Sequence, residues 1–145
     1  MSPGEQQFVN AMGDTLATWN LPRATGRVYG YLLLRGDASS SERLRADLSL
    51  SSGAVSTAIR ELVSWGLART LPQPGSRRLL VEAAGGFEQL LAASHERIRT
   101  FIRTLQAAEQ LTGDAHATRR LHEVMDLFRT YVEAGEEVLR GRGRA

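Results

Sequence analysis

The sequence of 145 residues contains no cysteine and no lysine, and it has no long apolar run. The absence of cysteine excludes disulfide bonds and metal sites built on thiolates. No stretch approaches the roughly 20 apolar residues that a membrane-spanning helix needs. The first residues, MSPGEQQF, have neither the basic segment nor the apolar run of a secretory signal. We therefore expect a cytoplasmic protein with no membrane association.

Motifs of metal binding and catalysis are also lacking. His116 and His122 lie six residues apart, which does not place them on one helix face at ligand spacing. With no third ligand beside them, we interpret both as surface residues and expect no metal and no cofactor. No motif marks a nucleophile, a base and an oxyanion donor that would share a cleft. We expect that the protein is not an enzyme.

The charge of the chain is distributed unevenly. Apolar residues make up 42% and charged residues 23%, which is ordinary for a globular protein, and the formal net charge is only +2. However, residues 21–80 carry nine arginines against four acidic residues, whereas residues 81–139 carry six against ten. This asymmetry indicates that the basic part meets a polyanion and that the acidic part has another task.

Two helices are predicted at the N-terminus. The first, over residues 5–19, follows from apolar residues at steps of three and four: Phe8, Met12, Leu16 and Trp19. Pro22 suits the first turn of a second helix, which ends near Leu34. Gly26 and Gly30 lie one turn apart in this helix, and they predict the close approach of another backbone.

Two short helices are predicted next. Ser39 and Glu42 fit a capping box for the third helix. Ser51 or Ser52 can cap the fourth, and Gly66 has the place and type of a residue that ends a helix in the left-handed conformation. The apolar face of the fourth helix is expected to comprise Val55, Ala58, Ile59, Leu62 and Val63.

A hairpin and two long helices complete the chain. Residues 67–71 and 78–83 are strand-like runs around a loop, PQPGSR, that is rich in proline and glycine. Gly113 and Asp114 separate the two long helices, the first as a stop and the second as a cap. The first long helix carries its apolar residues at Phe87, Leu91, Ile98, Phe101, Leu105 and Ala108, and the second at Leu121, Met125, Phe128, Tyr131 and Val138.

This order predicts a mainly α fold with a small β-hairpin wing, in which a winged helix-turn-helix domain is flanked by N- and C-terminal dimerisation helices. We expect four segments. They are an N-terminal dimerisation helix over residues 1–20, a DNA-binding domain over 21–84, a C-terminal helical dimerisation region over 85–140 and a disordered tail over 141–145.

The fourth helix and the wing carry the candidate DNA contacts: Ser51, Ser52, Gly53, Ser56, Thr57, Arg60, Arg77 and Arg78. Hydroxyl groups can bond phosphates or base edges, glycine allows close approach, and arginine can reach a guanine edge or a phosphate. Wing arginines commonly reach the minor groove or its phosphates. A serine-rich helix start alone is most often only a cap. The charge excess in the same sixty residues favours DNA binding.

Three runs also resemble a known family: LPRATGRVYGYLLL (21–34), SSGAVSTAIRELVSWGLA (51–68) and PGSRR (74–78). They are similar to the GbsR-like branch of the MarR family of bacterial transcription regulators, over roughly residues 5–83. The resemblance implies a homodimer on a near-palindromic operator in double-stranded DNA, usually as a repressor. It places the same candidate residues on the recognition helix and the wing, and it assigns the dimer interface to the first helix and the last two.

The chain departs from the usual pattern at two places in the helix-turn-helix unit. Arg45 and Ser49 stand where such units usually have alanine and glycine, and the wing offers Gly-Ser-Arg-Arg in place of Asp-x-Arg. Arg45 raises the question of whether the two helices can cross closely, unless its side chain extends outward.

MarR-type regulators often bind a small-molecule effector, and aromatic residues are the candidates for such a site: Trp19, Tyr31, Trp65, Phe101 and Phe128. Aromatic residues at helical spacing are more often ordinary core, and no effector is identified. We expect a dimeric DNA-binding transcription regulator, a repressor released by an effector. The alternatives are a winged-helix protein-interaction module without specific DNA binding, and a small-molecule binding protein without DNA activity. Steep salt dependence would distinguish DNA binding from the first alternative. The second would show a ligand-dependent shift in melting temperature but no duplex binding.

Overall fold

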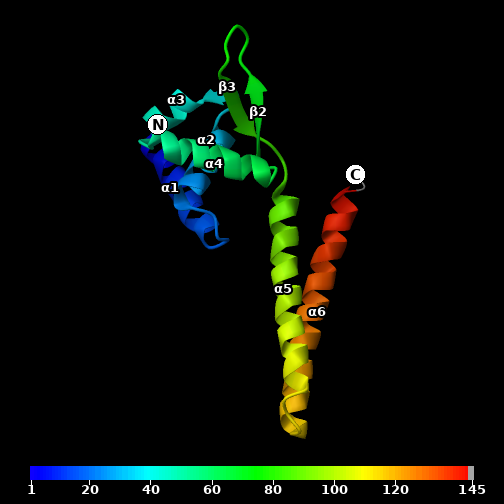
Figure 1. Cartoon of the computed structure of the whole chain (residues 1–145). Coiled ribbons are helices and arrows are strands. Elements are labelled where there is room, and N and C mark those ends of the chain that lie inside the picture. The colour runs from blue at the N-terminus through cyan, green and yellow to red at the C-terminus, as the bar shows by residue number, and fades with distance from the viewer. Residues whose placement is uncertain (144–145) are drawn as a thin grey trace. The chain divides into compact units, whose positions relative to one another are not determined.

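The computed structural model describes residues 1–143, and it confirms a mainly α fold with a hairpin wing (Figure 1). The chain divides into two compact units, one from Met1 to Phe87 and one from Glu88 onward. The elements of the first unit are α1 (Pro3–Ala17), α2 (Arg23–Leu34), β1 (Ser39–Ser40), α3 (Ser41–Leu48), α4 (Ser52–Ser64), β2 (Ala68–Pro72) and β3 (Leu79–Ala83). Helices α5 (Phe87–Glu109) and α6 (Ala115–Gly143) form the second unit.

Helices α1 and α2 cross through glycine. A Cβ atom placed on Gly26 would lie 2.7 Å from the carbonyl oxygen of Met12 and 2.9 Å from the Cα atom of Gly13. One on Gly30 would lie 3.0 Å from the Cβ atom of Met12. The predicted close approach of another backbone at these two glycines is confirmed. Because of this crossing, α1 packs within the first unit.

Helix α3 begins one residue later than predicted. Its N-cap is Ser40, whose hydroxyl accepts a hydrogen bond from the Arg43 amide at 3.2 Å. The predicted cap at Ser39 is therefore wrong. Ser39 instead belongs to β1 and pairs with Val81. A strand of two residues is too short to show alternation of apolar and polar side chains, so the sequence gives no sign of it.

The turn between α3 and α4 keeps its form without glycine. Ser49 adopts the left-handed conformation with φ 53°, and its N–H donates to the carbonyl oxygen of Arg45. The Leu50 N–H donates to the same oxygen at 3.1 Å. The Arg45 side chain is exposed, while Leu44 and Leu48 are buried. Arg45 and Ser49 are thus both accommodated without loss of the turn.

Helix α4 has the predicted cap at each end. The Ser51 hydroxyl accepts from the Ala54 amide at 3.1 Å. At the other end Gly66 has φ 74°, and the Leu67 N–H bonds to the carbonyl oxygen of Leu62 at 2.8 Å. This pairing is the Schellman motif that glycine permits. Of the apolar face, Val55, Ala58 and Leu62 are buried and Ile59 is half-buried, but Val63 is exposed and was wrongly placed on the inner side.

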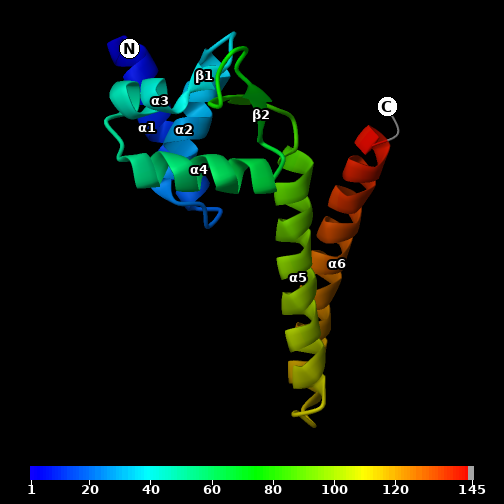
Figure 2. The ribbon, with the colours of Figure 1, turned by 45° about the horizontal axis from the view of Figure 1, so that its top comes forward.

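The three strands form one antiparallel sheet in the order β1-β3-β2. Figure 2 shows β1 beside the hairpin. Strands β2 and β3 pair from Ala68↔Ala83 to Pro72↔Leu79. In the loop between them Gly75 has φ 74°, and the Gln73 N–H donates to the Arg78 carbonyl at 3.2 Å. The hairpin predicted from the two strand-like runs is confirmed.

The second unit is a hairpin of two helices around a buried cluster of Ile102, Met125 and Val132. Asp114 caps α6 as predicted, since its carboxylate accepts from the His116 and Ala117 amides at 2.7 and 3.0 Å. Helix α6 continues to Gly143, so the predicted disorder is wrong for residues 141–143. The rest of the predicted tail lies outside the described residues. None of the helices within residues 1–143 is long and apolar enough to cross a membrane.

Candidate DNA-binding surface

The outer face of α4 carries most of the candidate DNA contacts. All the candidate residues on it are exposed: Ser51, Ser52, Gly53, Ser56, Thr57 and Arg60. A Cβ atom on Gly53 would meet no atom within 4 Å, so packing within the chain does not require glycine at this position. The missing side chain leaves the backbone open to a surface that approaches from outside.

The hydroxyl groups on this face differ in what they bind. Ser51 already accepts a helix amide, so its role in the fold is that of a cap. The hydroxyls of Ser52, Ser56 and Thr57 form no hydrogen bond with any of residues 1–143. A hydroxyl carries one donor and two acceptor positions. Three such groups in the first two turns of one helix can therefore bond phosphate or base-edge atoms of a partner.

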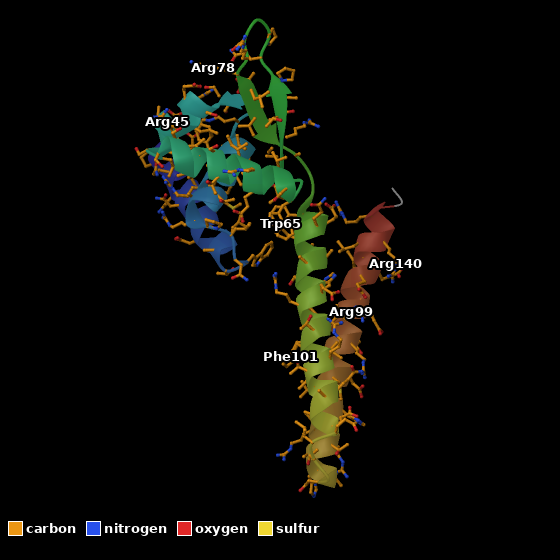
Figure 3. All side chains as sticks on the ribbon, in the orientation of Figure 1. Arg45, Trp65, Arg78, Arg99, Phe101 and Arg140 are labelled. Carbon is orange, nitrogen blue, oxygen red and sulfur yellow. The ribbon has the colours of Figure 1, made fainter. Side chains whose placement is uncertain are left out.

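The arginines around α4 fall into two groups. Among the described residues, Arg60 and Arg77 form no ion pair and no side-chain hydrogen bond. Arg78 instead pairs with Glu42 of α3, with 2.9 Å between Nη1 and Oε1. Figure 3 shows Arg78 on the hairpin and Arg45 near α3. The guanidinium groups of Arg60 and Arg77 are available to bind an anion. Arg78 must first release the Glu42 carboxylate.

Arg45 is a candidate contact that the sequence interpretation treated only as a departure. Its side chain is exposed on the first helix of the helix-turn-helix unit, and it has no ion pair within the described part of the chain. In such units the first helix crosses the DNA backbone. A cation at this position suits a phosphate, and the exchange of the usual alanine for arginine was the signal that could have identified it.

A hollow separates α4 from the wing. Ser56, Ile59 and Thr70 are shared by two adjoining pockets of about 280 and 180 Å³. Arg60 and Val63 complete the first. The second is completed by Ser41, Leu79, Leu80 and Val81. Hydroxyl and guanidinium groups at the rim of an apolar floor suit the sugars, phosphates and thymine methyl groups of a duplex.

The aromatic candidates for an effector site have packing roles. Tyr31 is fully buried, and its hydroxyl donates to the Asp47 carboxylate at 2.6 Å. Burial first, and then this hydrogen bond, raises the pKa of the Tyr31 phenol above its usual range. The Arg35 guanidinium lies 4.5 Å from the centre of the Tyr31 ring. Tyr31 is therefore a core residue of the first unit.

The other aromatic candidates are partly accessible. Trp19 packs edge-on against Phe87 with ring centroids 5.8 Å apart, and Trp65 is half-buried. In the second unit, Phe101 and Phe128 form another edge-on pair at 5.0 Å. The paired rings thus pack within their own units. Trp19 and Phe101 nevertheless remain partly exposed to solvent.

A short helix, a tight turn, a second helix with an exposed hydroxyl face and a basic wing together define a winged helix-turn-helix DNA-binding protein. The chain is 34% identical over 137 residues to the HTH-type transcriptional regulator MmpR5 of Mycobacterium tuberculosis (strain ATCC 25618 / H37Rv), a match that covers 90% of this chain and 81% of the relative. The protein belongs to the MarR family of transcription regulators. Members of this family are not enzymes, in agreement with the absence of catalytic motifs.

One solved structure is similar in fold over nearly the whole chain. The chain is 27% identical in sequence to a transcriptional regulator of known crystal structure, with a TM-score of 0.68. The match covers 99% of this chain and 100% of that one. Wild-type MarR from E. coli in its apo form is 21% identical with a TM-score of 0.46, over 86% of this chain and 96% of that one. No family model matches the chain. The GbsR-like branch stays a prediction.

Proposed function

We propose that this regulator binds a near-palindromic operator as a homodimer and represses transcription until a small-molecule effector releases it. The observation that carries the proposal is the outer face of α4, where exposed hydroxyls and Arg60 have no partners within the described chain. The relative from M. tuberculosis, an HTH-type transcriptional regulator, supports the same role. Such a protein acts where bacterial DNA lies, in the cytoplasm.

Each candidate residue has a stated part in this proposal. Arg60, in the middle of α4, reads a base edge in the major groove, because a long guanidinium can bond guanine in two places. Ser52, Ser56 and Thr57 bond phosphates, and Gly53 lets the backbone approach them. Arg77 and Arg78 on the wing reach the neighbouring minor groove or its phosphates. Arg45 holds a phosphate on the side of α3.

A second apolar face on α6 supports the homodimer. The face of α6 against α5 includes Leu121, Met125, Phe128 and Val132. A further row of apolar residues lies beside it and is exposed: Val124 at 38%, Leu127 at 67%, Tyr131 at 65% and Val138 at 61%. Contiguous apolar surface of this kind is unusual on a monomer. A second copy of the chain is the natural occupant, since a two-fold dimer matches two half-sites about one helical turn apart.

Release by an effector is the regulatory step of the proposal. It rests on the resemblance to MarR-type regulators and on the open aromatic edges of Trp19 and Phe101. An effector that binds the free protein more tightly than the DNA-bound form would shift the equilibrium away from the operator. It would also raise the melting temperature of the free protein, by an amount that grows with the logarithm of the effector concentration once the site is saturated.

The first experiment is fluorescence anisotropy with a labelled duplex from upstream of the protein's own gene. It is titrated at several salt concentrations beside a scrambled duplex of equal length. We expect tight, sequence-preferring binding that weakens steeply with salt as counterions are released. No binding at low salt by folded, dimeric protein would reject the proposal and favour a protein-interaction module.

A further inference from the structure

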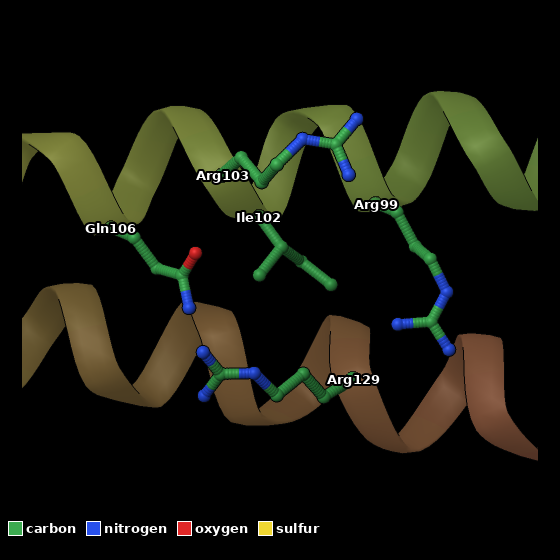
Figure 4. Close-up of a pocket in the computed structure, with 5 residues that line it drawn as sticks. All are labelled: Arg99, Ile102, Arg103, Gln106 and Arg129. Carbon is green, nitrogen blue, oxygen red and sulfur yellow. The ribbon is translucent and has the colours of Figure 1, made fainter.

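Three arginines surround a small pocket on one side of the α5–α6 hairpin. Arg99, Arg103 and Gln106 of α5 and Arg129 of α6 form its rim, and the buried side chain of Ile102 forms its floor. The pocket has a volume of about 140 Å³. Figure 4 shows Ile102 reaching between the two helices, with Arg99 on one side of it and Gln106 on the other, and with Arg129 across the gap on α6. None of the described residues that line this pocket is acidic.

The guanidinium groups keep hydrogen-bond donors that the chain does not use. Arg99 binds Glu136 through Nε and Nη2, which leaves its Nη1. Arg103 uses Nη2 for Thr100 and Glu96, at 2.9 and 3.2 Å, which leaves its Nε and Nη1. Within residues 1–143, Arg129 has only an ion pair at 3.8 Å with Asp126 and no side-chain hydrogen bond.

Each pocket arginine has an acidic partner: Glu136 for Arg99, Glu96 for Arg103 and Asp126 for Arg129. The hydrogen bond from Arg99 lowers the pKa of Glu136, so this carboxylate stays ionised and bound to Arg99. Each carboxylate occupies only part of the five donors of a guanidinium group, so the remaining donors are open to an oxyanion.

We propose that the pocket of Arg99, Arg103 and Arg129 binds a small oxyanion, a phosphate or carboxylate group, that bridges α5 and α6. Guanidinium donors form charge-assisted hydrogen bonds with the oxygens of both groups, and within the described residues Arg129 has its whole fork free for two parallel bonds. The gap is large compared with the ~30 Å³ that a water molecule occupies in the liquid. It is too small for a duplex, and an acidic helical unit repels nucleic acid.

The pocket lies on the opposite side of the hairpin from the exposed apolar row. At 100° per residue, Arg129 and Glu136 fall to one side of the face that α6 turns to α5. Leu127 and Tyr131 fall to the other side of that face. A dimer formed through the apolar row therefore leaves the pocket open to solvent. The site does not depend on DNA binding, so the test uses the free protein.

Isothermal titration of the full chain with inorganic phosphate, and separately with succinate, tests the proposal against a sodium chloride background of equal ionic strength. We expect saturable binding of at least one anion, with one site per chain. The Arg129→Gln and Arg103→Gln variants should each weaken it by about tenfold or more, because each loses a charge-assisted hydrogen bond. Saturation by phosphate alone would identify a phosphate ligand, and by succinate alone a carboxylate.

The matched control is Arg97→Gln, because Arg97 is an exposed arginine of α5 that does not line the pocket. It should bind the anion like the wild type, and the circular dichroism of all three variants should match that of the parent protein. The absence of saturable binding of either anion would overturn the proposal. An equal loss in Arg97→Gln would also overturn it, because the binding would then reflect net charge and not this pocket.

Discussion

Arg78 on the wing lies 2.9 Å from Glu42 on α3, so an arginine proposed to contact DNA is held by a carboxylate of its own chain. Both side chains are more than half exposed. An exposed ion pair adds little to stability, because water and salt screen it. Its consequence is functional instead, since DNA must displace Glu42 from Arg78 or accept a negative charge close to its phosphates.

The Glu42→Gln variant should bind duplex DNA several-fold more tightly than the wild type. The amide removes the competing charge while keeping the size of the side chain, and it also removes repulsion from the phosphates. Anisotropy at two salt concentrations measures the change, which should shrink at high salt. Asp14→Asn is the control, because it breaks an exposed ion pair with Arg23, 2.8 Å long, between α1 and α2. Unchanged affinity in Glu42→Gln would mean that Arg78 does not contact DNA.

Arg60→Ala and Arg77→Ala should weaken DNA binding in different ways. If Arg60 reads a base, its loss should cost about 1–3 kcal/mol on the operator and much less on random DNA. The loss of Arg77, a phosphate contact, should weaken binding to all sequences and reduce the salt slope by about one. Both follow from anisotropy titrations on operator and scrambled duplexes. If Arg60→Ala weakens binding to both duplexes equally, Arg60 contacts a phosphate and not a base.

Leu127→Ser should shift the protein from dimer to monomer. Leu127 is the most exposed residue of the apolar row on α6, and burial of such a side chain between two copies contributes roughly 1.5–3 kcal/mol. Light scattering during gel filtration over a range of concentrations measures the molar mass. Leu111→Ser is the control, because Leu111 is 86% exposed in the loop between the helices. If both variants keep the mass of the wild type, the dimer forms elsewhere.

Gly26→Ala should destabilise the first unit. The added methyl group would meet the backbone of α1 at 2.7 Å from the Met12 oxygen, and backbone cannot move aside without separating the helices. Overpacking of this kind costs about 1–3 kcal/mol, which urea unfolding would show. Gly36→Ala adds the same methyl group where no atom lies within 4 Å, and it should change the free energy of unfolding by less than about 0.5 kcal/mol.

Ser49→Gly should stabilise the protein. The left-handed conformation costs a residue with a side chain about 1–2 kcal/mol, and glycine avoids this cost. Glycine also has more freedom in the unfolded chain, which offsets about half of the stabilisation. A rise in the free energy of unfolding of up to about 1 kcal/mol is expected. Ser64→Gly is the matched control. Ser64 lies in the last turn of α4, where glycine should lower the free energy of unfolding. If Ser49→Gly lowers the free energy of unfolding, the inference that Ser49 is strained in this turn is wrong.

The sequence predicted those features that depend on one residue and its neighbours. Gly66, Asp114 and Ser51 end or begin helices as expected, because capping is a local property of the backbone. Gly26 predicted a close crossing, although not which helix would cross it. The two-residue strand at Ser39 was missed because its structure comes from pairing with Val81, which is distant in the chain.

The candidate site was predictable only in part for the same reason. The helical repeat placed Ser52, Ser56 and Arg60 on an outward face, and their exposure agrees with this. The pairing of Arg78 with Glu42 joins residues 36 positions apart, and no periodicity predicts such a contact. Whether these residues bind DNA remains a proposal that the titrations above decide.

Helix α4 is capped at both ends by its own chain, by the Ser51 hydroxyl at the start and by the bond from Leu67 at the end. Its shape is therefore complete before any duplex arrives. A DNA-binding helix that is already ordered in the free protein loses little conformational entropy when the complex forms. The encounter of such a rigid helix with DNA is then limited by diffusion and orientation, and the lifetime of the complex depends on the individual contacts.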